Sequence, residues 1–151
     1  MLRYIYGDQL HHYPVLQDTM HRDRATQFAE RLKWDVTVDA NGWERDDYDV
    51  INPLYVIWEN PDGTHGGSMR FLPTTGRTMV NDHFADLLNG ADIRSPFVWE
   101  CTRFVLNPKA GSRVAAAMML AGGELMRAFS LTHLLGVLDP RLVSIFSMIS
   151  S

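Results

Sequence analysis

Residues 97–106 read FVWECTRFVL, and this stretch decides how the rest of the chain is interpreted. Its alternating side chains predict a β-strand, in which successive residues point to opposite faces. Glu100 and Arg103 are three residues apart, so this pattern places them on opposite faces of the strand. Because a buried charge without a partner is costly, each of them needs a polar partner from elsewhere in the chain.

The strand pattern also assigns the neighbouring side chains to the two faces. One face is expected to carry Val98, Glu100, Thr102 and Phe104, and the other Trp99, Cys101, Arg103 and Val105. Cys101 is the only cysteine, and its apolar neighbours favour a buried core thiol over a nucleophile.

On both sides of this stretch, strand and helix patterns alternate. The expected elements are a helix over 17–33, a loop over 38–53, strands over 54–59 and 68–74, helices over 78–90 and 112–130, a strand over 133–138 and a last helix opened by Pro140. The Gly122-Gly123 pair within the long helix predicts close packing against a sheet. This order predicts an α/β (α+β) fold, with helices covering a mixed sheet.

The composition is that of one globular domain. The 151 residues are 46% hydrophobic and 21% charged, and they contain neither an apolar run long enough to span a bilayer nor a secretory signal pattern. We therefore expect a cytoplasmic protein with no membrane partner. The net charge is −4, yet residues 101–151 carry 5 basic and 2 acidic side chains. An acidic partner would be attracted to this part of the chain, although ordinary surface variation explains the asymmetry equally well.

Several kinds of chemistry lack their sequence patterns. The chain has no GxSxG nucleophile elbow, no GxxxxGK[ST] phosphate loop and no HExxH zinc motif. No Lys/Arg-rich tract indicates nucleic-acid binding. We therefore expect no metal and no nucleic-acid partner.

Polar residues stand out against their apolar surroundings at several positions. Arg70 lies in the strand SMRFLPT, and the acidic loop offers Asp46, Asp47 and Asp49 as partners for the buried charges. Two interpretations remain open for this cluster: a structural ion-pair network, or a polar cleft that recognises a charged small molecule.

An arginine and two aromatic residues mark the first helix. Arg24 and Phe28 are four residues apart and share a helix face, and Trp34 follows just past the expected helix end. Such a face could stack on a nucleobase or attract a sulfonium cation, but aromatic residues at this spacing more often form core.

In this order, these positions resemble the LuxI-type acyl-homoserine lactone synthases, the autoinducer synthase family. The resemblance extends from the first helix to the end of the chain. It includes the stretches ERDDYD, GGSMRFLPTT and WECTRF, and its motif positions are Arg24, Phe28, Trp34, Asp46, Asp49, Arg70, Glu100 and Arg103. It implies a fold similar to GNAT-type acyltransferases, with a mixed sheet that opens into a V-shaped cleft flanked by helices. It also implies that residues 1–151 form a single autoinducer synthase domain, short at its C-terminus by comparison with the family.

The resemblance implies a reaction with two substrates. The amine of S-adenosylmethionine attacks the thioester of an acylated carrier protein or acyl-CoA, and the methionyl carboxylate then closes a lactone and releases methylthioadenosine. S-adenosylmethionine is a substrate here, and no cofactor is expected. Two alternatives remain: a GNAT-like N-acyltransferase that uses acyl-CoA with another acceptor, and an inactive binding fragment.

The resemblance also implies roles for individual residues. The catalytic group comprises Glu100, Arg103 and Arg70, with Glu100 as the candidate base for the amine. The expected contacts to S-adenosylmethionine come from Arg24, Phe28, Trp34, Asp46 and Asp49. The candidates for docking an acidic acyl carrier protein are Lys109, Arg113, Arg127 and Arg141. Gly136 occupies a position where relatives that favour 3-oxo chains often carry threonine, which favours acyl chains without a 3-oxo group.

Overall fold

The computed structural model describes residues 1–84, 89–139 and 142–147 and contains one six-stranded sheet. Its strands are β1 (Leu2–Tyr6), β2 (Leu54–Glu59), β3 (His65–Pro73), β4 (Val98–Leu106), β5 (His133–Asp139) and β6 (Leu142–Ser147). They are ordered as they follow in the chain, and all neighbours are antiparallel except β4 and β5. The mixed sheet expected from the sequence is confirmed.

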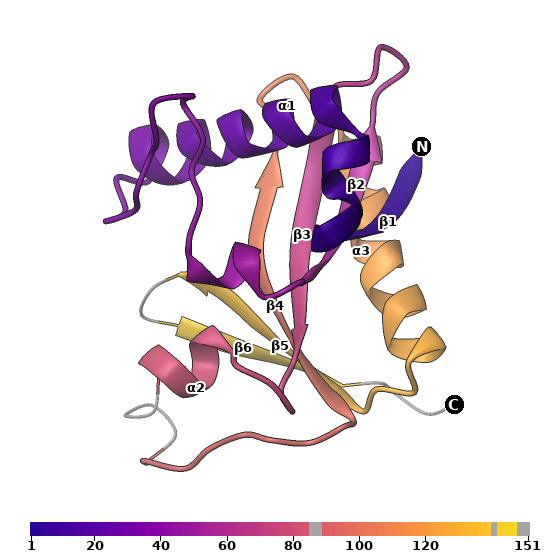
Figure 1. The fold of residues 1–151 in the computed structure, drawn as a ribbon. Coiled ribbons are helices and arrows are strands. Elements are labelled where there is room, and N and C mark those ends of the chain that lie inside the picture. Colours follow the sequence, from indigo (N-terminus) through magenta and orange to yellow (C-terminus); the bar gives the residue numbers. More distant parts are fainter. Residues whose placement is uncertain (85–88, 140–141, 148–151) are drawn as a thin grey trace.

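Helices cover both faces of this sheet (Figure 1). The α-helices are α1 (Pro14–Arg24), α2 (Met79–His83) and α3 (Ser112–Ala128). Three shorter or irregular helices are η1 (Gly7–His12), η2 (Ala25–Arg31) and η3 (Asp47–Val50). The π-helical η2 continues α1, so together they account for the helix expected over 17–33. None of the helices in the described ranges has the length and apolar content needed to cross a bilayer.

Two apolar clusters show which helix covers which face. Met118, Ala121 and Leu125 of α3 pack with alternate residues of β2, β3 and β4, among them Val56 and Phe71. On the opposite face, α1 packs on the intervening residues of β1 and β2. A third cluster joins α2 to β5 on the same face as α1. The region between α1 and α2 therefore lies on one face, and α3 lies on the other.

The sheet splits where β4 meets β5. These strands pair only over Val98–Cys101 and His133–Gly136, although β4 continues to Leu106 and β5 to Asp139. Beyond this point they diverge, and β5 and β6 leave the direction of β3 and β4 (Figure 1). This divergence is the V-shaped opening that the resemblance implied.

The assignment of faces along β4 was wrong beyond Thr102. The register with β3 shifts between Ser68 and Arg70, so that Arg103 and Phe104 together oppose Met69. Arg103 has a φ of 54°, in the left-handed region, as in a β-bulge with one extra residue. The extra residue reverses the alternation, so Arg103 lies on the same face as Glu100, and Phe104 packs against the core under α3.

The prediction for the last element was also wrong. Residues Leu142–Ser147 form β6, which pairs antiparallel with β5, where a helix opened by Pro140 was expected. Proline begins helices and also occupies turns, while LVSIFS alternates and contains β-branched residues suited to a strand. Strand β1 was not expected at all, and α2 ends before the expected position at Gly90.

The glycine pair in α3 does not pack closely against the sheet. A Cβ atom built at Gly122 or at Gly123 would meet no heavy atom within 4 Å. The prediction of close packing is therefore wrong, and both glycines border open space.

Candidate active site

Three arginines and three carboxylates form a closed ring of ion pairs between α1, the 44–49 segment and the sheet. Each arginine contacts two carboxylates, and each carboxylate contacts two arginines. In order around this ion-pair ring, the residues are Arg24, Glu44, Arg103, Asp46, Arg70 and Asp49. The charges balance, and no buried side-chain nitrogen or oxygen of the described residues lacks a hydrogen-bond partner.

Arg24 joins the end of α1 to the ring. Its Nη1 and Nη2 donate to the two carboxylate oxygens of Asp49 at 2.8 and 2.9 Å, and its Nε donates to Glu44 Oε1 at 2.9 Å. The side chain is 1% exposed. Burial alone would lower the pKa of Arg24, but Asp49 and Glu44 raise it well above its ordinary value. The guanidinium is therefore a fixed positive charge.

Arg70 joins β3 to the ring. Its guanidinium contacts both oxygens of Asp46, at 2.6 and 3.0 Å, and Asp49 Oδ1 at 3.1 Å. Its Nε donates to Thr102 Oγ1 on the neighbouring β4 at 2.9 Å. Burial would raise the pKa of Asp49, but Arg24 and Arg70 hold it well below its usual range.

Arg103 reaches the ring because of the bulge. Its Nε donates to Glu44 Oε1 at 3.0 Å, and its Nη2 lies 3.0 Å from Asp46 Oδ2. The guanidinium carbon also lies 5.2 Å from the centre of the Phe28 ring, a cation–π distance. On a regular strand, Arg103 would point to the face covered by α3 and could not make these contacts.

Glu44 was missed by the sequence analysis, although it is fully buried and bridges Arg24 and Arg103. A signal for it existed. Three buried arginines need three carboxylates, and two aspartates from the acidic loop leave one positive charge unmatched. Of the remaining candidates, Asp47 is exposed and lies outside the ring.

The acidic segment is shaped by its own side chains. Asp46 accepts a hydrogen bond from the Tyr48 backbone N–H, and Asp49 accepts one from the Asp46 backbone N–H, which together form a capping box at η3. Tyr55 of β2 also donates to Asp49, at 2.5 Å. These contacts present both aspartates to the arginines.

Glu100 lies beside the ring but is not part of it. Its two carboxylate oxygens accept hydrogen bonds from the backbone N–H groups of Met79 and Val80, at 3.1 and 2.6 Å. These residues open α2, where a carboxylate is favoured by the helix dipole. Burial raises the pKa of Glu100, and the two N–H donors oppose that shift. Glu100 thus fixes α2 against β4.

Two neighbouring hollows adjoin the ring and share the lining residues Asp35, Val36 and Arg103. The larger, about 500 Å³, is lined by five carboxylates and two arginines, namely Asp35, Asp39, Glu44, Asp46, Asp47, Arg45 and Arg103, with Val36, Thr37 and Val50. The lining of the second, about 260 Å³, also includes Trp34, Met79, His83 and Val137. Trp34 stacks on Phe28 with ring centres 4.8 Å apart. We call the two hollows together the acidic pocket.

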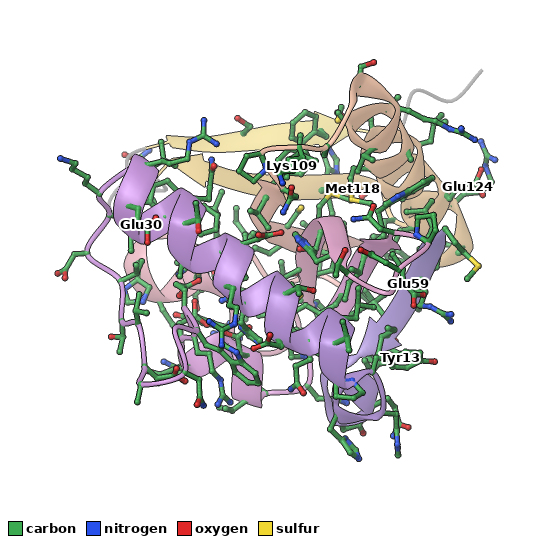
Figure 2. All side chains as sticks on the ribbon, turned by 90° about the horizontal axis from the view of Figure 1, so that it is seen from above. Tyr13, Glu30, Glu59, Lys109, Met118 and Glu124 are labelled. Carbon is green, nitrogen blue, oxygen red and sulfur yellow. The ribbon has the colours of Figure 1, made fainter. Side chains whose placement is uncertain are left out.

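An apolar cavity of about 270 Å³ lies on the other face, under α3. Its lining includes Phe104 and Cys101 of β4, Gly136 of β5 and the methionines Met69, Met118, Met119 and Met126. Burial raises the pKa of the Cys101 thiol to about 12, so the thiol stays protonated, as expected for a core residue. Figure 2 shows Met118 directed toward the sheet and Glu124 directed away from it.

The two spaces lie on opposite sides of the sheet at its split. Arg103 and Val137 line the acidic pocket, while their neighbours in sequence, Phe104 and Gly136, line the apolar cavity. Each pair straddles the point where β4 and β5 part. The acidic pocket and the apolar cavity therefore lie back to back at the place where β4 and β5 part.

The basic docking candidates do not form one compact patch. Lys109, Arg113 and Arg127 are all exposed, but the first two lie at the start of α3 and Arg127 near its end, paired with Glu124 at 3.7 Å. Arg141 lies outside the described residues. The segment just before α3 borders a hollow of about 280 Å³, whose lining includes Asn107, Pro108, Ala110 and Arg31.

Ser68, His65 and Asp23 form a second polar cluster, linked in the same order as the Ser-His-Asp triad of hydrolases. His65 Nε2 lies 2.7 Å from Ser68 Oγ, and His65 Nδ1 lies 2.6 Å from Asp23 Oδ2. However, Ser68 and His65 are buried, and neither lines the pocket or the cavity described above. Asn107 also donates to Asp23, so the cluster anchors α1 to β3 and β4. Within the described ranges, no group of His, Cys, Asp and Glu side chains is arranged to hold a metal ion.

Sequence comparison identifies acyl-homoserine-lactone synthases as relatives of this chain. The sequence model for autoinducer synthases matches residues 8–148. An acyl-homoserine-lactone synthase of Rhizobium etli is 40% identical over 156 aligned positions, covering 99% of this chain and 73% of the relative. One from Pseudomonas aeruginosa is 36% identical, covering 74% of this chain and 55% of the relative. The chain thus spans about half to three quarters of these relatives.

Solved structures agree with the sequence relatives. The crystal structure of the AHL synthase LasI superposes with a TM-score of 0.76 at 30% identity, covering 90% of this chain and 70% of that one. The CoA-dependent acyl-homoserine lactone synthase BjaI shares the fold, with a TM-score of 0.78 at 22% identity, covering 90% and 65%. An N-acetyltransferase from Lactobacillus plantarum also shares it, with a TM-score of 0.55 at 14% identity, covering 89% and 73%. The fold is thus GNAT-like, and the chain belongs to the autoinducer synthase family of acyltransferase enzymes.

Proposed function

We propose that this chain transfers an acyl group to the amine of S-adenosylmethionine and forms an acyl-homoserine lactone. The observation that carries this proposal is the pairing of two unlike spaces at one gap. The acidic pocket suits a cationic substrate, the apolar cavity suits an acyl chain, and Arg103–Phe104 and Gly136–Val137 separate them. The reacting groups of the two substrates would meet between β4 and β5.

The charge of the acidic pocket supports S-adenosylmethionine as the acceptor. This substrate carries a sulfonium and an ammonium group, and five carboxylates in the larger hollow outnumber two arginines. Trp34 offers an aromatic face to the sulfonium or the adenine ring. Phe28 supports Trp34 from behind, and Arg24, Asp46 and Asp49 hold the pocket wall in place through the ion-pair ring.

The reaction needs a neutral amine and a place for its proton. The amine nitrogen attacks the thioester carbonyl carbon, an amide bond forms and the thiol leaves. The methionyl carboxylate oxygen then attacks its own γ-carbon, and the carbon–sulfur bond breaks to release methylthioadenosine. We assign Glu100 as the proton acceptor through water, because it is bound to the backbone N–H of Met79, whose side chain lines the acidic pocket. Arg70 and Arg103 hold the surrounding charges in place.

The apolar cavity offers no polar group at Gly136. A Cβ atom at Gly136 would lie 3.0 Å from the Phe146 ring, so a larger side chain there would need that ring to move. No hydroxyl group is therefore offered at this position to a 3-oxo substituent. We propose that the preferred chains lack a 3-oxo group.

The start of α3 is the proposed contact for the acyl donor. Gly111 precedes the helix without a side-chain cap, and Lys109 and Arg113 are exposed at this end of the helix. Such a helix end favours a phosphate group. Acyl carrier protein and acyl-CoA both present a phosphopantetheine phosphate, so this contact serves either donor. The solved structure of BjaI contains S-adenosylmethionine and isopentyl-CoA, which supports two substrates on this fold.

Mass spectrometry of culture extract from cells that express this chain tests the proposal. We expect an acyl-homoserine lactone of defined chain length that is absent from cells with an empty vector. Acylated products of another amine, without lactone, would instead support a GNAT-like acyltransferase with a different acceptor. S-adenosylmethionine binding in calorimetry without any product would support an inactive binding fragment.

A further inference from the structure

The wall that α3 contributes to the apolar cavity lacks a side chain at its middle. Met118, Gly122 and Met126 are spaced by four residues and form one row on the helix. Met118 and Met126 are buried and fill their parts of the wall, whereas Gly122 contributes no side chain. The row spans about 12 Å at 1.5 Å per residue, so Gly122 lies half-way along it.

The absence of a side chain at position 122 is not explained by packing. A Cβ atom at Gly122 would meet no heavy atom within 4 Å, so no neighbour requires a glycine there. Its φ is not positive, so the backbone does not require one either. Glycine within a helix is nevertheless unfavourable compared with alanine. The remaining consequence of Gly122 is open space inside the cavity.

The direction of the cavity shows which part of a ligand would meet this space. Phe104 and Gly136 lie at the gap between β4 and β5, where the thioester would react. Leu134 lies two residues back along β5, and Met126 lies near the end of α3 that leads into β5. An acyl chain that enters from the opening between β4 and β5 passes Gly122 before it reaches Leu134 and Met126.

We propose that Gly122 determines the longest acyl chain that the protein accepts. This inference rests on the proposed function, because it assumes that the apolar cavity holds the acyl group. Short chains end before Gly122 and do not depend on it, whereas longer chains use the space that the missing side chain leaves. Gly123, which is more exposed, borders the same cavity at its rim.

The test compares acyl-CoA binding by wild-type protein and by the variant Gly122→Leu. Titration calorimetry with butanoyl-, octanoyl- and dodecanoyl-CoA measures affinity without requiring turnover. We expect nearly unchanged affinity for butanoyl-CoA and a growing loss for longer chains. The loss should be about tenfold for every two methylene groups that the cavity no longer takes.

Two further variants separate this effect from damage to the fold. Gly122→Ala should raise the melting temperature and still weaken dodecanoyl-CoA binding, because alanine favours the helix and fills part of the space. Ala116→Leu adds a side chain of the same size on the exposed side of α3 and should leave all three affinities unchanged. Equal losses for all three chains, or no loss in either Gly122 variant, would overturn the inference.

Failure of the proposed function would look different. Wild-type protein that binds acyl-CoA with the expected chain-length dependence, but yields no lactone with S-adenosylmethionine, would leave Gly122 as the length determinant of an acyl site with another acceptor. If wild-type protein binds all three acyl-CoA molecules equally, the cavity does not hold the chain and the inference about Gly122 is wrong.

Discussion

Single residues of the ion-pair ring depend on one another, because each charge is shared by two partners. Glu44 contacts both Arg24 and Arg103, so its removal affects two arginines at once. The ring therefore acts as one structural unit that ties α1, the acidic segment and β4 together.

Replacing Glu44 by Gln should destabilise the fold by about 3–5 kcal/mol, because it leaves two buried guanidinium groups short of negative charge. Urea denaturation followed by circular dichroism measures the change. Asp47→Asn is the matched control, since Asp47 is exposed and lies three residues away. A loss no larger than that of the control would show that the ring does not stabilise the fold.

His21, another single buried residue, makes the stability of the fold depend on pH. Burial lowers the pKa of His21 to about 4, and its Nδ1–H donates to the Glu44 carbonyl oxygen at 2.9 Å. The unfolded chain binds a proton near pH 6.5 and the folded chain does not, so stability is complete above that pH and falls between about 6.5 and 4. The expected loss over this range is on the order of 3 kcal/mol.

Denaturation midpoints at pH 7, 6 and 5 test this dependence. His21→Asn keeps a hydrogen-bond donor near the Glu44 carbonyl oxygen and should flatten the dependence of stability on pH. Part of the dependence should remain, because the pKa of the buried His65 is also lowered. His133→Asn, at an exposed position, should keep the full dependence. A profile equally steep in His21→Asn and wild type would contradict the assignment.

Much of the site could be predicted from residue types alone. Buried arginines need carboxylates, so the meeting of Arg24, Arg70 and Arg103 with acidic-loop residues follows from the cost of burying charge. Which carboxylates meet which arginines could not be predicted, since it depends on a bulge and a capping box. Glu44 was missed for this reason. The roles of these residues in binding and catalysis remain predictions.

Among the elements, α2 depends most on a single contact. It has only five residues, and Glu100 accepts hydrogen bonds from the N–H groups of its first two, Met79 and Val80. Met79 and His83 of α2 line the acidic pocket. Glu100 therefore positions one wall of the pocket as well as serving as the proposed base.

Glu100→Gln should lower kcat about 100-fold and change the pH profile of kcat, because the amide keeps the shape but accepts no proton. His83→Gln is the comparison, since His83 is the other titratable side chain on that wall. The Michaelis constant for S-adenosylmethionine separates the two roles of Glu100: it rises if only the position of α2 has changed. Turnover that is unchanged across pH in Glu100→Gln would refute its role as the base.

Three of the six strands in the described ranges were predicted closely, for a physical reason. Strands β2, β4 and β5 match the predicted ranges within one residue or so, because their alternation and β-branched content arise from burial in a sheet. The bulge at Arg103 left no such signal, because a positive φ at arginine depends on the partner strand. Strand β6 was mistaken for a helix because Pro140 starts both helices and turns.

Across the whole fold, the sheet separates two spaces of opposite character. The acidic pocket lies on the face of α1 and α2, and the apolar cavity lies on the face of α3. Lys109, which is labelled in Figure 2, and Arg113 lie at the start of α3 and form a third surface, proposed for the acyl donor.

Reversing Lys109 and Arg113 to Glu should raise the Michaelis constant for an acyl carrier protein about tenfold and weaken its salt dependence, because the attraction to an acidic partner is lost. Steady-state kinetics at two salt concentrations measures both effects. Arg127→Glu tests whether the docking surface extends along α3, and Arg94→Glu is the remote control. Unchanged kinetics in the double variant would reject this surface.

We propose that both substrates react at the gap between β4 and β5. Purified protein incubated with S-adenosylmethionine and octanoyl-CoA tests this, with octanoyl-homoserine lactone and methylthioadenosine measured together by mass spectrometry. We expect both products to form in equal amounts. Octanoyl transfer to S-adenosylmethionine without methylthioadenosine, or the release of methylthioadenosine without any lactone, would contradict it.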